Sequence, residues 1–249
     1  MAQIDERADN HKADDGLNLR QDLNAGTKIG VNEIRQRFLD IKTHVAHCKP
    51  KIIGVTKYYG AESIIKGYEA GIRDFGESRA IEAVAKIKSL PEEIVKGSTF
   101  HFIGHLQTNK VDKVVGNFDY IHSIDSFRLA SIVSKELTQT GRRIKILLQL
   151  NNAGEEQKFG YSKEELLADL PMILNLENVD IVGLMNIAPL GADEQTLRYL
   201  FSDVRGFRDS LENRFNIKLP ELSMGMSDDY IIAVQEGATM VRIGRKLFT

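Results

Sequence analysis

The chain has 249 residues, which is enough for one large α/β barrel or for two ordinary domains. The 33 Lys and Arg residues nearly balance the 35 Asp and Glu residues, and this net charge of -2 gives nucleic-acid binding no support. A single cysteine, Cys48, excludes an intramolecular disulfide and suits a reducing compartment, and no apolar run is long enough to span a membrane.

Residues 1–26 differ from the rest of the chain because acidic side chains outnumber basic ones among scattered leucines. They lack the basic and apolar regions of a secretory signal, so we expect a cytoplasmic protein. We predict that 1–26 form a polar N-terminal extension, at most a partly ordered helix on the outside of the fold. Residues 27–249 are then the folded domain.

An apolar stripe with helical spacing begins at Val31. Val31, Ile34, Phe38, Ile41 and Val45 recur every three or four residues and predict a helix over 31–48, which ends before Pro50.

Strands and helices alternate through the rest of the chain. The predicted strands are 51–57, 73–78, 99–104, 120–125, 145–151, 179–187, 221–226 and 239–244. The predicted helices lie near 61–71, 78–89, 107–115, 126–140, 162–176, 193–214 and 228–236.

This strict alternation predicts an α/β protein with a parallel sheet. Eight such units are typical of a single (β/α)8 barrel of the TIM type, in which chemistry takes place at the C-terminal ends of the strands. The alternative is a doubly wound open sheet, but no Gly-rich dinucleotide loop follows the first strand. Because few residues follow the last strand, we expect the helix at 31–48 to cover the barrel between the last strand and the first.

Lys57 ends the predicted strand in the segment KIIGVTKYYG, residues 51–60. A lysine at a strand end often only extends its ammonium out of the core. A desolvated lysine, however, has a lowered pKa and a free amine that condenses with a carbonyl. The segment leaves both interpretations open.

A second group of residues predicts an anion site. In LSMGMSDDY, residues 222–230, the Ser227 hydroxyl and backbone N–H groups precede a helix, although Asp228 and Asp229 are also ordinary helix-capping residues. In VRIGR, residues 241–245, Gly244 permits a close backbone approach and Arg245 adds charge. The loops after the last two strands of such barrels commonly bind phosphate.

Arg242 alternates with Val241 and Ile243, so it faces into the barrel if its two neighbours face the helices. A buried arginine needs an acceptor, which is either a carboxylate such as Glu77 or a ligand atom such as a pyridine nitrogen. A reactive lysine and a phosphate site together fit a ligand with an aldehyde and a phosphate. Pyridoxal 5'-phosphate (PLP) fits this description, and so does a sugar phosphate on a Schiff-base aldolase.

Three other features have weaker functional interpretations. His101 and His105 are four residues apart, but a strand and turn do not bring them to one metal ion, so we expect structural histidines. The polar loop 151–162 is predicted to be a mobile rim, and Cys48 to be a packing residue.

Seven motifs in register make the sequence recognisable. They are GVTKYYG, FGES, HFIGHLQTNK, IHSIDS, GLMNIAP, LSMGMSDDY and EGATMVRIG. Over about residues 28–248 the chain resembles the YggS/PROSC family, the pyridoxal phosphate homeostasis proteins. The resemblance implies a fold-type III PLP barrel, similar to the N-terminal domain of alanine racemase.

The resemblance also implies the roles of individual residues. Lys57 would form the Schiff base with PLP, and Arg242 would contact the pyridine nitrogen. Ser227, with the backbone of Met226, Gly244 and Arg245, would bind the phosphate. Two positions depart from the family pattern, because Ser78 replaces an asparagine near the cofactor and Arg245 replaces a Thr or Ser.

Turnover at PLP needs an electron sink and acid and base groups beside the substrate Cα. An arginine keeps its proton, so the ring nitrogen stays neutral and the ring is a poorer sink. Related racemases and decarboxylases use a second β domain, which we do not expect here. We therefore expect a non-catalytic protein of PLP homeostasis, a monomer or weak dimer that passes PLP to apoenzymes and binds neither nucleic acid nor membranes. The alternatives are a PLP-dependent amino-acid racemase with Lys57 as a base and a class I aldolase.

Overall fold

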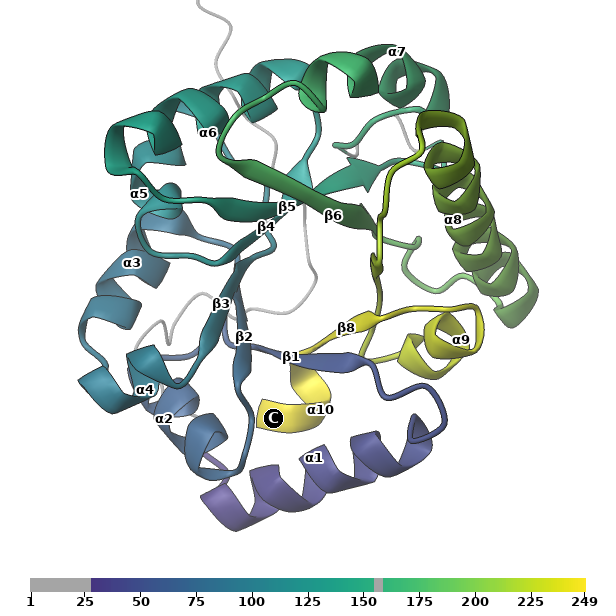
Figure 1. Cartoon of the computed structure of the whole chain (residues 1–249). Helices are drawn as coiled ribbons and strands as arrows, with labels where there is room; N and C mark the ends of the chain where they lie inside the picture. The colour runs from purple at the N-terminus through teal and green to yellow at the C-terminus, as the bar shows by residue number, and fades with distance from the viewer. Residues whose placement is uncertain (1–27, 155–158) are drawn as a thin grey trace, which may run out of the picture.

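The computed structural model describes residues 28–154 and 159–249, so the predicted extension at 1–26 lies outside the described residues. Within these ranges eight parallel strands close into a barrel in the order β1 to β8, with helices around it (Figure 1). Strand β1 pairs with β8 as well as with β2. The predicted barrel is therefore confirmed, and the open sheet is excluded.

All eight predicted strands are present, with small differences at their ends. The strands are β1 (Lys51–Val55), β2 (Asp74–Glu77), β3 (Thr99–Phe102), β4 (Tyr120–Ile124), β5 (Ile144–Leu150), β6 (Val179–Asn186), β7 (Glu221–Met226) and β8 (Met240–Ile243). The strand predicted over 51–57 ends at Val55, so Lys57 lies in the turn that follows it.

The α-helices of the described ranges include two short ones that the sequence pattern did not indicate. They are α1 (Val31–His44), α2 (Ala61–Glu69), α3 (Ala80–Lys88), α4 (Glu92–Lys96), α5 (Val111–Val115), α6 (Phe127–Thr140), α7 (Lys163–Ile173), α8 (Glu194–Phe215), α9 (Tyr230–Gln235) and α10 (Arg245–Phe248). The unpredicted helices are α4 and α10, which are too short to show a period of 3.6 residues, and the helix predicted near 107–115 begins as the 3-10 turn Thr108–Lys110. No helix in the described ranges is long and apolar enough to cross a membrane.

The strands divide the apolar residues into two layers. Val241 and Ile243 of β8 belong to the large core between the barrel and its helices. A smaller cluster fills the inside of the barrel and consists of Ile53, Tyr120, Leu147, Met185 and Met240. Because side chains alternate along a strand, Arg242 faces into the barrel, as predicted.

The gap between β8 and β1 is covered from the N-terminal side, as predicted. In α1, Ile34 and Ile41 are buried, and the helix packs against α2 and α10 (Figure 1). In α10, Phe248 is buried beside Gly54 of β1. Cys48, predicted to pack, is exposed, since α1 already ends at His44.

Candidate functional site

Lys57 is held in a tight turn at the C-terminal end of β1. The Tyr59 N–H donates to the Thr56 carbonyl at 2.9 Å, and the buried Thr56 hydroxyl donates to Glu77 Oε1 at 2.6 Å. Lys57 itself is half-buried, with its Nζ 4.8 Å from the centroid of the Tyr58 ring. The turn therefore fixes the backbone of Lys57 and leaves its side chain at the mouth of the barrel.

The carboxylate that accepts from Thr56 is already paired with a cation. Lys86 of α3 places its Nζ 2.5 Å from Glu77 Oε1 and 2.9 Å from the Thr56 carbonyl oxygen. Both side chains are buried, at 10% and 2% exposure. Lys57 has no ion-pair partner among the described residues, and its amine is available to a ligand.

The turn after β7 carries Ser227. Gly225 has φ +89°, and a Cβ on it would lie 2.5 Å from the Ala233 Cβ, so only glycine lets β7 pass this close to α9. Ser227 as a residue is 5% exposed, and its hydroxyl makes no hydrogen bond within the described part of the chain. A hydroxyl without a protein partner at this strand end fits a site for a polar ligand group.

The backbone of Met226 is less available than the sequence predicts. Its N–H donates to Asp229 Oδ1 at 2.5 Å. Burial raises the pKa of the Asp229 carboxyl, although this hydrogen bond and Arg242 act in the opposite direction. An anion that used the Met226 N–H would have to displace Asp229.

The turn after β8 lies beside both neighbouring strands. A Cβ on Gly244 would be 3.4 Å from the Val55 carbonyl oxygen of β1, which is the close approach predicted for this glycine. Arg245 is exposed, and its Nη2 lies 2.5 Å from Asp228 Oδ2 in the turn after β7. Arg245 thus balances a carboxylate at the rim of the predicted anion site.

Arg242 is buried inside the barrel, and its acceptors among the described residues are two backbone carbonyls and one hydroxyl. Nη1 donates to the Ser223 carbonyl at 2.6 Å and to the Ser223 hydroxyl at 2.7 Å, and Nη2 donates to the Asn186 carbonyl at 2.8 Å. The ion pair with Glu77 is wrong, because Glu77 pairs with Lys86. Burial lowers the pKa of Arg242 to about 10, so the guanidinium stays charged at neutral pH.

The Arg242 guanidinium has N–H groups that no described residue accepts from. Three of its N–H groups have acceptors among the described residues, out of the five that a guanidinium carries. The two others can donate to a ligand atom. Ser223 was missed in the sequence, although the alternation of ELSMGM places it on the inward side with Gly225.

Most of the predicted residues converge on three neighbouring strands. Met226 of β7 pairs with Arg242 of β8, and Ile243 of β8 pairs with Gly54 of β1. Lys57, Ser227 and Gly244 follow the C-terminal ends of these strands. A free amine, an unpaired hydroxyl and a charged guanidinium therefore face one end of the barrel.

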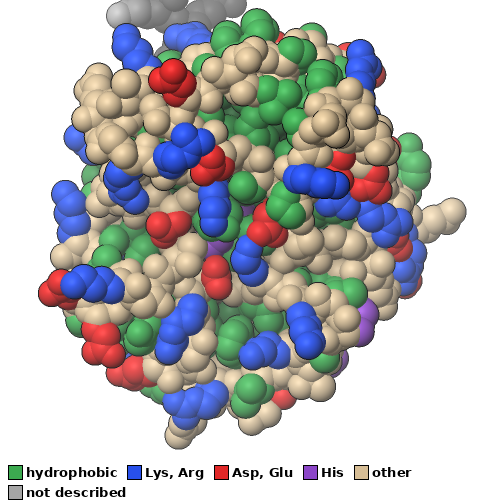
Figure 2. Space-filling view, in the orientation of Figure 1, with side chains coloured by type: hydrophobic (Ala, Val, Ile, Leu, Met, Phe, Trp, Pro, Cys, Tyr) green, Lys and Arg blue, Asp and Glu red, His purple; other side chains and the backbone are tan. Residues whose placement is uncertain are grey.

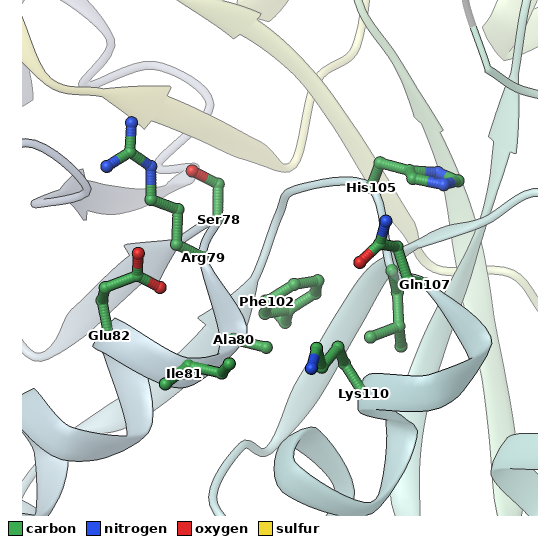
Figure 3. A pocket seen from close by; sticks show the side chains of 10 residues that line it. Ser78, Arg79, Ala80, Ile81, Glu82, Phe102, His105, Gln107 and Lys110 are labelled. Atoms are coloured by element: carbon green, nitrogen blue, oxygen red, sulfur yellow. The ribbon is translucent and has the colours of Figure 1, made fainter. Parts of the chain in front are cut away.

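Ser78 lies beside a separate cleft. It follows β2 and lines a cleft of about 350 Å³ between the start of α3 and the loop after β3 (Figure 3). Arg79 and Glu82 lie on the Ser78 side, opposite Gln107 and Lys110 (Figure 3). Lys57 is not one of the lining residues, so the predicted cofactor contact of Ser78 stays a prediction.

The two histidines singled out by spacing have different surroundings. His105 lies at the rim, with its Nδ1 3.4 Å from Asp125 Oδ2 and its ring stacked on Phe159 at 3.6 Å between centroids. His101 is buried inside the barrel, where it bonds to His122 and Asp74. No cluster of three possible metal ligands occurs in residues 28–154 and 159–249.

Part of the predicted mobile rim, the loop 151–162, is anchored to β5. Tyr161 donates its N–H to the Gln149 carbonyl at 2.8 Å, and the Gln149 side chain donates to the Phe159 carbonyl at 2.7 Å. Residues 155–158 of the loop lie outside the described residues.

Comparison with known proteins agrees with this arrangement. The model of the alanine racemase N-terminal domain matches residues 29–249. The pyridoxal phosphate homeostasis protein of Synechocystis is 40% identical over 198 residues, which is 80% of this chain and 90% of that protein. The human pyridoxal phosphate homeostasis protein is 37% identical over 213 residues, which is 80% of this chain and 76% of that protein.

Solved structures show the same barrel. PipY of Synechococcus elongatus, with PLP bound, has a TM-score of 0.80 at 38% identity, and the match covers 87% of this chain and 100% of PipY. Alanine racemase of Clostridium difficile has a TM-score of 0.72 at 15% identity, so it shares the fold. The match covers 88% of this chain and 57% of that enzyme.

Proposed function

This chain belongs to the pyridoxal phosphate homeostasis proteins, and we propose that it binds PLP covalently through Lys57 without turning it over. The observation that carries the proposal is the unpaired, half-buried amine of Lys57 beside the unpaired Ser227 hydroxyl and the charged Arg242. PLP supplies an aldehyde that condenses with a primary amine and a phosphate that binds to anion donors. The donor set at β1, β7 and β8 fits both groups.

Each residue has a distinct role in this proposal. Lys57 is the covalent tether, and its fixed turn keeps the amine at the mouth of the barrel. Ser227 donates its hydroxyl to the phosphate, together with backbone N–H groups at Gly244 and Arg245. Arg242 donates to the ring nitrogen from the interior of the barrel. Met226 contributes its N–H only if Asp229 releases it, and Ser78 would reach the cofactor from the neighbouring cleft.

The properties of Arg242 argue against turnover. Its pKa of about 10 keeps the guanidinium charged at neutral pH, so it offers a hydrogen bond and no proton to the ring nitrogen. A ring with a neutral nitrogen is a weak electron sink, which suits storage of the cofactor better than chemistry on an amino acid. We therefore propose a carrier, a monomer or weak dimer, whose recipients are PLP-dependent apoenzymes.

A titration with PLP tests the covalent tether. We expect the visible absorbance band of a PLP–lysine adduct in the wild type and no such band in Lys57→Ala. Lys246→Ala is the matched control, because Lys246 is an exposed lysine near the same end of the barrel. A wild type that takes up a sugar phosphate and gives no band with PLP would contradict the proposal and indicate a Schiff-base aldolase.

A separate measurement tests the absence of turnover. The PLP-loaded protein is incubated with common amino acids in heavy water, and exchange at the α-carbon is followed by proton NMR. We expect no exchange above that of free PLP. Lys57-dependent exchange of any amino acid would show that the protein is an enzyme of the racemase type.

A further inference from the structure

A row of buried polar side chains crosses the inside of the barrel from Arg242 to the opposite mouth. The Ser223 hydroxyl, which accepts from Arg242, lies 2.8 Å from His122 Nδ1. His122 Nε2 lies 2.9 Å from His101 Nδ1, and His101 Nε2 lies 3.1 Å from Asp74 Oδ1. These five residues come from five strands and form one continuous chain of hydrogen bonds.

The proton positions in this chain follow from its carboxylate end. A carboxylate only accepts, so His101 carries its proton on Nε2 and donates it to Asp74, and a neutral His101 then accepts at Nδ1. His122 therefore carries its proton on Nε2 and donates it to His101. A neutral His122 accepts at Nδ1, so Ser223 donates its hydroxyl proton there while its oxygen accepts from Arg242.

The surroundings keep both imidazoles neutral. His101 and His122 are both fully buried, and burial lowers the pKa of each, that of His122 well below the ordinary value. The charged groups that act on them include cations as well as acids. His101 faces Asp74, Asp119 and Lys51, and His122 faces Arg242 and Lys51.

The chain ends at a carboxylate that water reaches. The Asp74 side chain is 25% exposed and lines a cleft of about 310 Å³ at the N-terminal ends of the strands. Lys51 and Lys145 line the same cleft. Figure 2 views the molecule from this end, and acidic and cationic side chains lie interspersed around the centre of the face.

We propose that Ser223, His122, His101 and Asp74 are positioning residues for Arg242. Each hydrogen bond of the chain fixes the orientation of the next residue, and the last one turns the Ser223 lone pairs toward Arg242 Nη1. The N–H groups of Arg242 that remain then point to the cofactor. The proposal rests on PLP binding at Lys57. In addition, the hydrogen bond from Arg242 to the ring nitrogen depends on residues that extend to the N-terminal end of the barrel.

The proton arrangement is tested on the protein without PLP. Long-range proton–nitrogen NMR on the full chain with 15N-histidine distinguishes the two neutral tautomers from imidazolium, and His101→Phe and His122→Phe assign the signals. We expect both histidines as neutral Nε2–H tautomers at pH 7. An Nδ1–H tautomer or a charged ring at either position would overturn the proposal.

The effect on the cofactor is tested through PLP affinity. A substitution that removes one hydrogen bond of the chain leaves the neighbouring residue free to reorient. We therefore expect Asp74→Ala and His122→Phe each to raise the dissociation constant of PLP by about fivefold, which corresponds to the free energy of one hydrogen bond. Asp74→Asn keeps an acceptor for His101 and should restore wild-type affinity. Tyr120→Phe is the control, because Tyr120 stacks on His101 at 4.5 Å but is not part of the chain.

The outcomes separate this proposal from the proposed function. If Asp74→Ala and His122→Phe lower the melting temperature but leave PLP affinity at the wild-type value, the chain is only structural and the proposal is wrong. If the wild type does not bind PLP, the proposed function fails, while the tautomer measurement still reports on the chain.

Discussion

At the scale of single residues, Arg245 is the departure from the family pattern with the clearest consequence. The side chains of Arg245 and Asp228 are 70% and 66% exposed, so their ion pair contributes little to folding. Its position matters more, since it joins the turns after β7 and β8 at the proposed phosphate site. Arg245 keeps Asp228 from presenting an uncompensated negative charge to the phosphate.

Replacing Arg245 should therefore weaken PLP binding. We expect Arg245→Ala to raise the dissociation constant of PLP several-fold at low salt, on the order of 1 kcal/mol, and to do so less at high salt because exposed charges are screened. Fluorescence titration at two salt concentrations measures this. Asp228→Asn in the Arg245→Ala background should recover the affinity, and an unchanged dissociation constant in Arg245→Ala would contradict the role assigned to the pair.

Arg242 shows how much of the site a single sequence can predict. Alternation along β8 placed Arg242 inside the barrel, but the alternative of an ion pair with Glu77 was wrong. Arg242 lies level with Ile53 and Asp74, which is three residues deeper than Glu77. The stagger between strands is a property of the closed barrel, and spacing along one strand does not reveal it. For the same reason, the sequence did not predict the hydrogen bond between His101 on β3 and His122 on β4.

At the scale of elements, the unpredicted helix α10 completes the barrel. Four residues, Arg245–Phe248, form a single turn that buries Leu247 and Phe248. The long apolar stripe of α1 was visible in the sequence because it repeats over four turns, whereas one turn gives no period. Together, α1 and α10 cover the outer face where β8 meets β1.

Removing the aromatic ring of α10 should destabilise the whole barrel. Phe248 is 1% exposed, and Phe→Ala in a core costs about 3 kcal/mol or more of unfolding free energy. Urea denaturation of Phe248→Ala measures the loss. Lys246→Ala, in the same helix but exposed, should change the free energy of unfolding by less than about 1 kcal/mol. Equal effects of the two substitutions would show that α10 does not seal the barrel.

At the scale of the whole molecule, the barrel encloses a polar row within an apolar interior. The free energy of unfolding should therefore depend on pH. Both His101 and His122 have lowered pKa values in the folded state, so below about pH 6.5 the unfolded chain binds protons that the folded chain does not. Stability then falls as the pH falls.

Between pH 7.5 and 5.5 we expect a loss of about 1.4 kcal/mol for each histidine that stays neutral. Urea unfolding at several pH values measures it. Asp229 acts with the opposite sign, because burial raises its pKa. The double variant His101→Phe/His122→Phe isolates the share of the histidines, and a slope that persists in this variant would contradict the assignment.

The central claim is that Lys57 is a covalent tether for PLP, and reductive trapping tests it most directly. The PLP-loaded protein is reduced with borohydride and digested, and the modified peptide is identified by mass spectrometry. We predict the pyridoxyl group on Lys57, in the peptide that contains GVTKYYG, and no labelling of Lys86, which is already paired with Glu77. Labelling of another lysine, or no label at all under saturating PLP, would contradict it.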